Sequence, residues 1–105
     1  MAILPYVYTN PAQIESGIQR AAQALAPDVV RIRYNFDDDW VGDPSVFFRI
    51  VISDKAFRAR RLAETLHRIR DGIRDEVRPD ELGIHAYFNF RSLSDESTDP
   101  DPAWS

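Results

Sequence analysis

A chain of 105 residues, 44% hydrophobic and 11% aromatic, is long enough to form one domain around a single core. It carries a formal net charge of −4 and no cysteine, which excludes disulfides, thiolate metal sites and thiol catalysis. The first ten residues lack the features of a secretory signal, and no apolar run reaches the ~18 residues of a membrane span. We therefore expect a soluble cytoplasmic protein that makes no contact with a membrane.

The acidic residues are concentrated in two segments. The last twelve residues, SDESTDPDPAWS, hold four acids and no Lys or Arg, and four more aspartates lie between positions 37 and 43. Taking these eight acids from the total of 17 leaves nine, against 13 basic residues. We expect residues 1–93 to form one α+β domain, neutral in sum but mildly basic outside its aspartate loop, and residues 94–105 to be an acidic, disordered tail.

The first predicted helix begins at Pro11. Asn10 is a favourable N-cap, proline suits the first helical position, and Gln13 completes a capping box. An apolar stripe with helical spacing then runs to Pro27: Ile14, Ile18, Ala21, Ala22 and Leu25. The preceding segment, ILPYVY, allows an extra edge strand, because Pro5 lacks the amide proton that a central strand needs.

Two strands follow this helix. Residues 29–36, VVRIRYNF, alternate between apolar and polar, which is typical of a half-buried strand. Residues 46–52, VFFRIVI, are apolar on both faces apart from Arg49, which is typical of a central strand. The breaker Gly42-Asp43-Pro44 lies between them, so the sequence predicts an antiparallel hairpin.

A second helix is predicted from Ser53 or Asp54 to Pro79, and a third alternating strand from 84 to 91, IHAYFNFR. The helix carries the longest apolar stripe of the chain: Ala59, Leu62, Ala63, Leu66, Ile69, Ile73 and Val77. A right-handed crossover through this helix makes the second and third strands parallel.

The order α-β-β-α-β predicts a two-layer sandwich, with two helices on one face of a mixed sheet. The sheet has three strands, or four in a ferredoxin-like order if ILPYVY pairs with it. Type II KH domains and the ferredoxin-like fold have related element orders. The second helix, however, has no GxxG loop, and the strands lack the glycine–aromatic signature of an RNA-recognition motif.

The loop FDDDWVGDPS could be a turn or a cation site. Its carboxylates, Asp37, Asp38, Asp39 and Asp43, would suit a hard cation such as Ca²⁺, but the D-x-D-x-D-G pattern is absent. Aspartate is also a favoured turn residue, so we interpret the loop as a hairpin turn and expect no metal. Trp40 within it either folds back over the helices or is offered to a partner.

No catalytic constellation is visible, so we expect no enzymatic activity and no cofactor. His67 and His85 have no partner at metal-ligand spacing. Lys55 and Arg58, with Arg60 and Arg61, lie at the predicted amino end of the second helix, where free amides favour an anion. A solvated charged face is the simpler interpretation of this cluster.

One sheet face has an unusual composition. The alternation places ten residues on the face away from the helices: Arg31, Arg33, Asn35, Phe47, Arg49, Val51, His85, Tyr87, Asn89 and Arg91. They include four arginines and no acid. This composition suits an acidic protein partner or a homodimer, a single-stranded nucleic acid, or only a solvated polar surface.

We expect protein contact or homodimerisation first, because the negative net charge weakens steering toward nucleic acid. Single-stranded nucleic-acid binding on the same face is the alternative. The acidic tail begins beside Arg91, and its carboxylates and Trp104 could mask part of this face.

Overall fold

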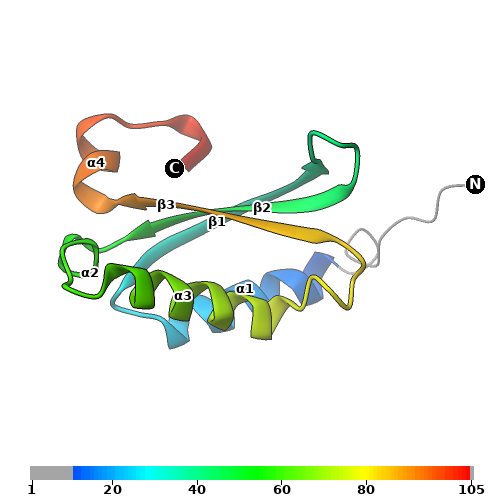
Figure 1. Ribbon diagram of the computed structural model, residues 1–105, viewed down its shortest axis with the longest axis horizontal. Helices are drawn as coiled ribbons and strands as arrows, with labels where there is room; N and C mark the ends of the chain where they lie inside the picture. Colours follow the sequence, from blue (N-terminus) through cyan, green and yellow to red (C-terminus); the bar gives the residue numbers. More distant parts are fainter. Residues whose placement is uncertain (1–10, 105) are drawn as a thin grey trace, which may run out of the picture.

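The chain folds as two layers, with α1 and α3 packed on one face of a three-stranded sheet (Figure 1). This computed structural model describes residues 11–104. The elements in chain order are α1 (Pro11–Ala24), β1 (Val29–Asp38), β2 (Pro44–Ile52), α2 (Asp54–Phe57), α3 (Leu62–Val77), β3 (His85–Ser92), α4 (Leu93–Thr98) and a 3₁₀ turn, η2 (Pro102–Trp104). The predicted Asn10 cap and the ILPYVY strand lie outside the described residues.

The sheet has the predicted connections. Its strand order is β1-β2-β3, with β1 and β2 antiparallel and β2 and β3 parallel. The strands β2 and β3 are parallel because the crossover through α3 returns the chain to the end of the sheet at which β2 begins. The prediction of a two-layer α+β fold in the order α-β-β-α-β is confirmed, and β2 is the central strand.

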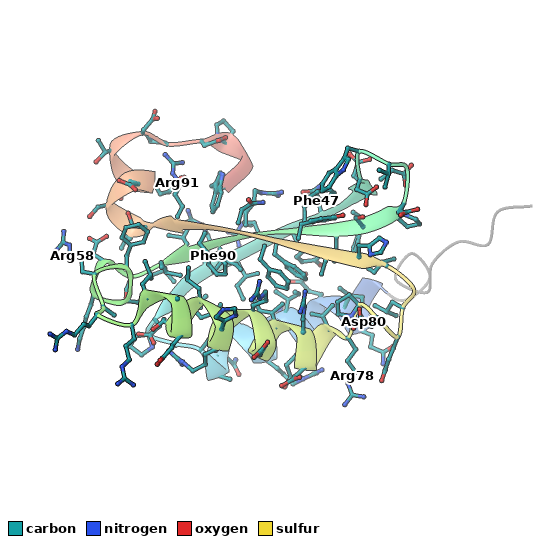
Figure 2. All side chains as sticks on the ribbon, viewed as in Figure 1. Phe47, Arg58, Arg78, Asp80, Phe90 and Arg91 are labelled. Carbon is teal, nitrogen blue, oxygen red and sulfur yellow. The ribbon has the colours of Figure 1, made fainter. Side chains whose placement is uncertain are left out.

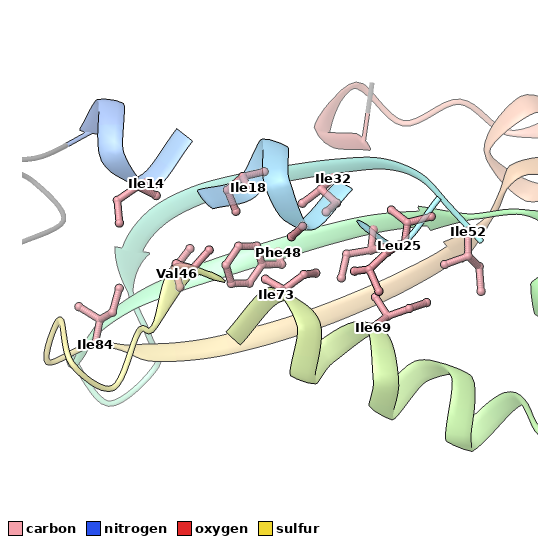
Figure 3. Packing of buried hydrophobic residues seen from close by; sticks show 14 residues of the cluster. Ile14, Ile18, Leu25, Ile32, Val46, Phe48, Ile52, Ile69, Ile73 and Ile84 are labelled. Carbon is pink, nitrogen blue, oxygen red and sulfur yellow. The ribbon is translucent and has the colours of Figure 1, made fainter. Parts of the chain in front are cut away.

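The core lies between the sheet and the two long helices (Figure 3). Val46, Phe48, Ile50 and Ile52 point from β2 toward the helices and are fully buried. Their partners come mainly from one stripe on each helix and from the flanking strands: Ile14, Ile18, Leu25, Ile32, Ile69, Ile73, Val77 and Ile84. The two stripes are the ones that the helical spacing of apolar residues predicts.

The prediction of one continuous second helix is wrong. Residues 58–61, Arg-Ala-Arg-Arg, separate the four-residue α2 from α3. Positive side chains near a helix amino terminus oppose the helix dipole, and no side chain caps α3 at Arg61. Ser53 does cap α2, because its Oγ accepts a hydrogen bond from the Ala56 amide at 3.1 Å.

The later start of α3 also shortens its buried stripe. Ile69, Ile73 and Val77 are buried, whereas Leu66 is only half-buried and Ala63 is exposed. Within residues 11–104, no helix combines the length and apolar character needed to cross a membrane.

Candidate interaction surface

The strand registers bring the predicted face together. Residues directly opposite one another in a sheet present their side chains on the same side. The side away from α1 and α3, called the open face below, therefore consists of four rows across β1, β2 and β3. These rows are Arg31–Val51–Arg91, Arg33–Arg49–Asn89, Asn35–Phe47–Tyr87 and Asp37–Ser45–His85. All ten residues predicted for this face lie on it.

The first of these rows is covered by the end of the chain. Residues 93–104, called the strap below, contain α4 and η2 and turn back over the open face (Figure 1). Figure 2 shows Arg91 beneath the strap and Phe47 at the other end of the sheet, on the same side. Val51 is only 1% exposed although it belongs to this face, because η2 packs against β2.

Glu96 of the strap lies between two arginines of the sheet. Its carboxylate is 2.6 Å from Nη1 of Arg91 and 3.8 Å from Nη2 of Arg31. Glu96 is 6% exposed, so this three-residue ion cluster is largely withdrawn from water. The same arginines also donate to strap carbonyls, Arg91 to Asp99 at 2.7 Å and Arg31 to Trp104 at 2.9 Å.

The sequence predicts disorder for residues 94–105, whereas the structure gives most of this segment regular structure. Ser92 caps α4 by accepting a hydrogen bond from the Asp95 amide at 3.1 Å. Asp95 and Glu96 lie in the first turn of α4, where acidic side chains favour the helix dipole. The sequence does contain a signal for the start of α4, because Ser92-x-x-Asp95 matches a capping pattern, although no apolar run follows it.

A second contact fixes the strap to α2. The amide of Ser94 donates to Oδ1 of Asp54 at 2.9 Å, and its hydroxyl donates to Oδ2. The hydrogen bonds from the Ser94 side chain and backbone lower the pKa of Asp54. The sequence predicts Asp54 only as a possible start of the second helix, and nothing in its pattern indicates this contact with Ser94.

The other end of the open face carries an aromatic patch made of Trp40, Phe47 and Tyr87. The rings of Phe47 and Tyr87 stack with centroids 5.1 Å apart, and Trp40 lies 5.2 Å from Tyr87. Trp40 is 79% exposed and its neighbour Val41 is 68% exposed. Trp40 therefore does not fold back over the helices, the first of its two predicted positions, but lies beside Tyr87 at the open face.

Asp39 holds the loop that carries Trp40. Its Oδ1 accepts from the amides of Val41 at 3.0 Å and Asp43 at 2.9 Å, and its Oδ2 accepts from the Tyr87 hydroxyl at 2.8 Å. Burial alone would raise the pKa of Asp39, but these hydrogen bonds and nearby His85 together lower it. The aspartate loop is thus a turn, built around one buried carboxylate that also orients Tyr87.

One group of side chains has a geometry that could admit a cation. Ligand atoms of Asp39, Asp43 and His85 lie within 4.8 Å of one another, and His85 Nε2 is 3.4 Å from Asp43 Oδ2. The Asp39 carboxylate already accepts three hydrogen bonds, so coordination would compete with the turn itself. The expectation that the loop binds no metal stays a prediction.

The middle of the open face is polar. Arg33 and Asn89 are exposed, and Arg49 donates to the side chain of Asn35 in the next row. This row of positive charge separates the aromatic patch from the strap.

Lys55 and Arg58 lie elsewhere, on α2. Both are exposed, and Arg58 is the C-cap of this short helix, so the pair does not stand at the amino end of a long helix as predicted.

Comparison with models of known protein families found no match to this chain, and comparison with curated proteins found none either.

Proposed function

We propose that this protein is a small, non-enzymatic, cytoplasmic binding module that receives another protein chain on its open face. The aromatic patch carries this proposal. Trp40 and Val41 are exposed at 79% and 68%, beside the stacked rings of Phe47 and Tyr87. Tryptophan, tyrosine and arginine are the residues that most often dominate protein–protein binding energy.

The patch is also held in position before any partner arrives. Tyr87 is fixed by its hydrogen bond to Asp39, and the Asp39 turn determines where Trp40 lies. Side chains that are already ordered lose less conformational entropy on binding. This preorganisation supports a binding role for the aromatic patch. Exposed apolar patches of this kind often mark sites of interaction with other proteins.

The charges around the patch favour an acidic partner. Arg33 and Arg49 lie in the adjacent row, so an acidic protein segment would find positive charge next to an apolar anchor. A second copy of the chain fits the same description, because its own aspartate loop would offer acids to these arginines. Both partners use the same residues of the open face.

Single-stranded nucleic acid is the alternative ligand, since arginine beside stacked aromatic rings also suits bases. The acids on either side of the patch disfavour it. Asp37, Asp38 and Asp43 border one end of the face, and the strap brings four acids to the other end. A phosphate backbone is charged along its whole length and would meet both groups, whereas a protein segment can place its acids beside Arg33 and Arg49 alone, so a protein chain is the better fit.

The test is photo-crosslinking in the cells that produce this protein. Phe47 is replaced by the photoreactive p-benzoylphenylalanine, and Phe57 on α2, which is 41% exposed, receives the same replacement as the matched control. We expect discrete protein adducts from position 47, reduced several-fold by Trp40→Ala, and few from position 57. Equal adducts from both positions, or none from position 47, would contradict the proposal. Adducts that disappear on nuclease treatment would instead support the nucleic-acid alternative.

A further inference from the structure

We propose that Arg31 and Arg91 form a second binding site for an acidic, helical peptide segment, and that the strap occupies this site as an internal ligand. A partner docked on the aromatic patch would replace the strap with an acidic segment of its own. This inference rests on the proposed function and adds to it the chemistry of the segment and the contact that it must displace.

The contacts of Glu96 show what the site recognises. Arg31 and Arg91 stand on β1 and β3, on either side of Val51 of β2, so they are about 10 Å apart at the backbone. One carboxylate placed above Val51 reaches both guanidinium groups, as Glu96 does at 2.6 and 3.8 Å. Charge-assisted hydrogen bonds of this kind are stronger than neutral ones, particularly where water is excluded.

The other hydrogen bonds that Arg31 and Arg91 donate to the strap go to its backbone. Arg91 donates to the carbonyl oxygens of Asp95 and Asp99, and Arg31 to that of Trp104. The Asp95 carbonyl also accepts the Asp99 amide within α4, whereas the carbonyl of Asp99, the C-cap residue, lies at the end of the helix, where carbonyls lack helical partners. The site therefore fits a short helix with one inward-facing acid and a carboxyl-terminal end that lies over Arg91.

Most described side chains of the strap are exposed. Of its described side chains only Glu96 is buried, while Leu93 is 37% exposed and Asp99 points into solvent. Trp104 is half-buried, with its ring 6.0 Å from the Arg91 guanidinium. The strap binds through the ion cluster, its backbone carbonyls and the hydrogen bonds from Ser94 to Asp54. Another acidic helix can reproduce the first two.

A competing segment needs an advantage, because the strap is covalently attached and so has a high effective concentration. The aromatic patch supplies it. Phe47 and Val51 are four residues apart on β2, or about 13 Å along the strand. A partner anchored at the patch would hold its acidic segment near Arg31 and Arg91 and offset the advantage of the strap.

The experiment uses the full chain and a fluorescein-labelled peptide with the sequence of residues 92–105. Binding is followed by fluorescence anisotropy for the unaltered protein and for Glu96→Gln, which keeps the side-chain volume but removes the charge that holds the strap. Asp99→Asn is the matched control, because the Asp99 carboxylate lies 4.0 Å from Arg91 and is 95% exposed. We expect Glu96→Gln to bind the peptide at least tenfold more tightly than the unaltered protein, and Asp99→Asn to differ from it by less than twofold.

Two further measurements make the result specific. Adding Arg31→Ala to Glu96→Gln should abolish peptide binding, and a peptide with Gln in place of Glu96 should not bind. The Trp104 indole NH signal in the NMR spectrum of Glu96→Gln should shift toward its position in the free peptide, which reports release of the strap in a folded protein.

Equal peptide affinity of the unaltered protein and Glu96→Gln, with an unshifted Trp104 signal, would overturn this inference. Peptide binding that survives Arg31→Ala would also overturn it. Crosslinking from position 47 is independent of the strap, so adducts there alongside a failed peptide experiment would remove the internal ligand and leave the proposed function standing.

Discussion

At the scale of single residues, Asp39 links the loop to the aromatic patch. One carboxylate accepts two amides of its own turn and the hydroxyl of Tyr87. The hydrogen bond to Asp39 also raises the pKa of Tyr87, since ionisation of that phenol would place two negative charges side by side. Removing the Asp39 charge should therefore loosen both the turn and Tyr87.

We predict that Asp39→Asn destabilises the protein at neutral pH and that the effect fades in acid. The pKa of Asp39 is lowered in the folded state, so its contribution is fully present above the unfolded value of about 3.9. It is lost as pH falls through the lower folded value. Urea unfolding at pH 7 and pH 2.5 measures this, with Asp38→Asn, an exposed carboxylate in the same loop, as the control. A stability difference that does not shrink in acid would contradict this assignment.

At the scale of secondary structure, α1 and α3 touch where a side chain would not fit. A Cβ atom at Gly17 would lie 2.9 Å from the carbonyl oxygen of Glu76, a backbone atom of α3. The equivalent atom at Gly72 would meet only the end of the Leu25 side chain at 3.3 Å. The two glycines therefore have similar helical settings but different neighbours.

We predict that Gly17→Ala and Gly72→Ala change stability in different ways. Both gain up to about 1 kcal/mol of helix propensity. At Gly17 the helices must separate, which costs about 1–3 kcal/mol, so the net effect is destabilising. At Gly72 the flexible leucine can move, and the net change should stay within about 1 kcal/mol of zero. Thermal unfolding of the two variants measures this, and equal melting temperatures would show that α1 and α3 are not in close backbone contact.

The sequence predicts strands more fully than helices in this protein. The alternation in residues 29–36 and 84–91 places the side chains that these runs contribute to the open face correctly, because a period of two leaves only one choice of face. Asp37 and Ser45, which complete the fourth row, were not predicted to lie on this face. The break between α2 and α3 was missed because a stripe at helical spacing continues through residues 59–63. Helix continuity depends there on charge and capping, which the apolar pattern does not record.

The position of the strap could not be predicted from its own residues. Its contacts with Arg31 and Asp54 join residues that are 40 or more positions apart, and only the folded sheet brings them together, whereas Arg91 is a near neighbour of the strap in the sequence. The Asp39–Tyr87 hydrogen bond has the same origin. Composition indicated an acidic segment near a basic face, but not the single carboxylate that connects them.

At the scale of the whole molecule, the two sides of the sheet have separate roles. One side is buried by α1 and α3 and supplies the core. The open face is divided into an end covered by the strap, a polar middle row and an exposed aromatic patch. We propose that a protein partner covers the aromatic patch when the molecule is in its cell.

Oxidative footprinting tests this claim directly. Brief hydroxyl-radical labelling is applied to the purified, dilute protein and to intact cells, and modification of Trp40 is compared with that of Phe57 by mass spectrometry. We expect Trp40 to be labelled readily in the purified protein and several-fold less in cells. We also expect this protection to survive nuclease treatment of a gentle lysate, while Phe57 is labelled equally throughout. Equal labelling of Trp40 in both settings would show that no protein partner covers the aromatic patch.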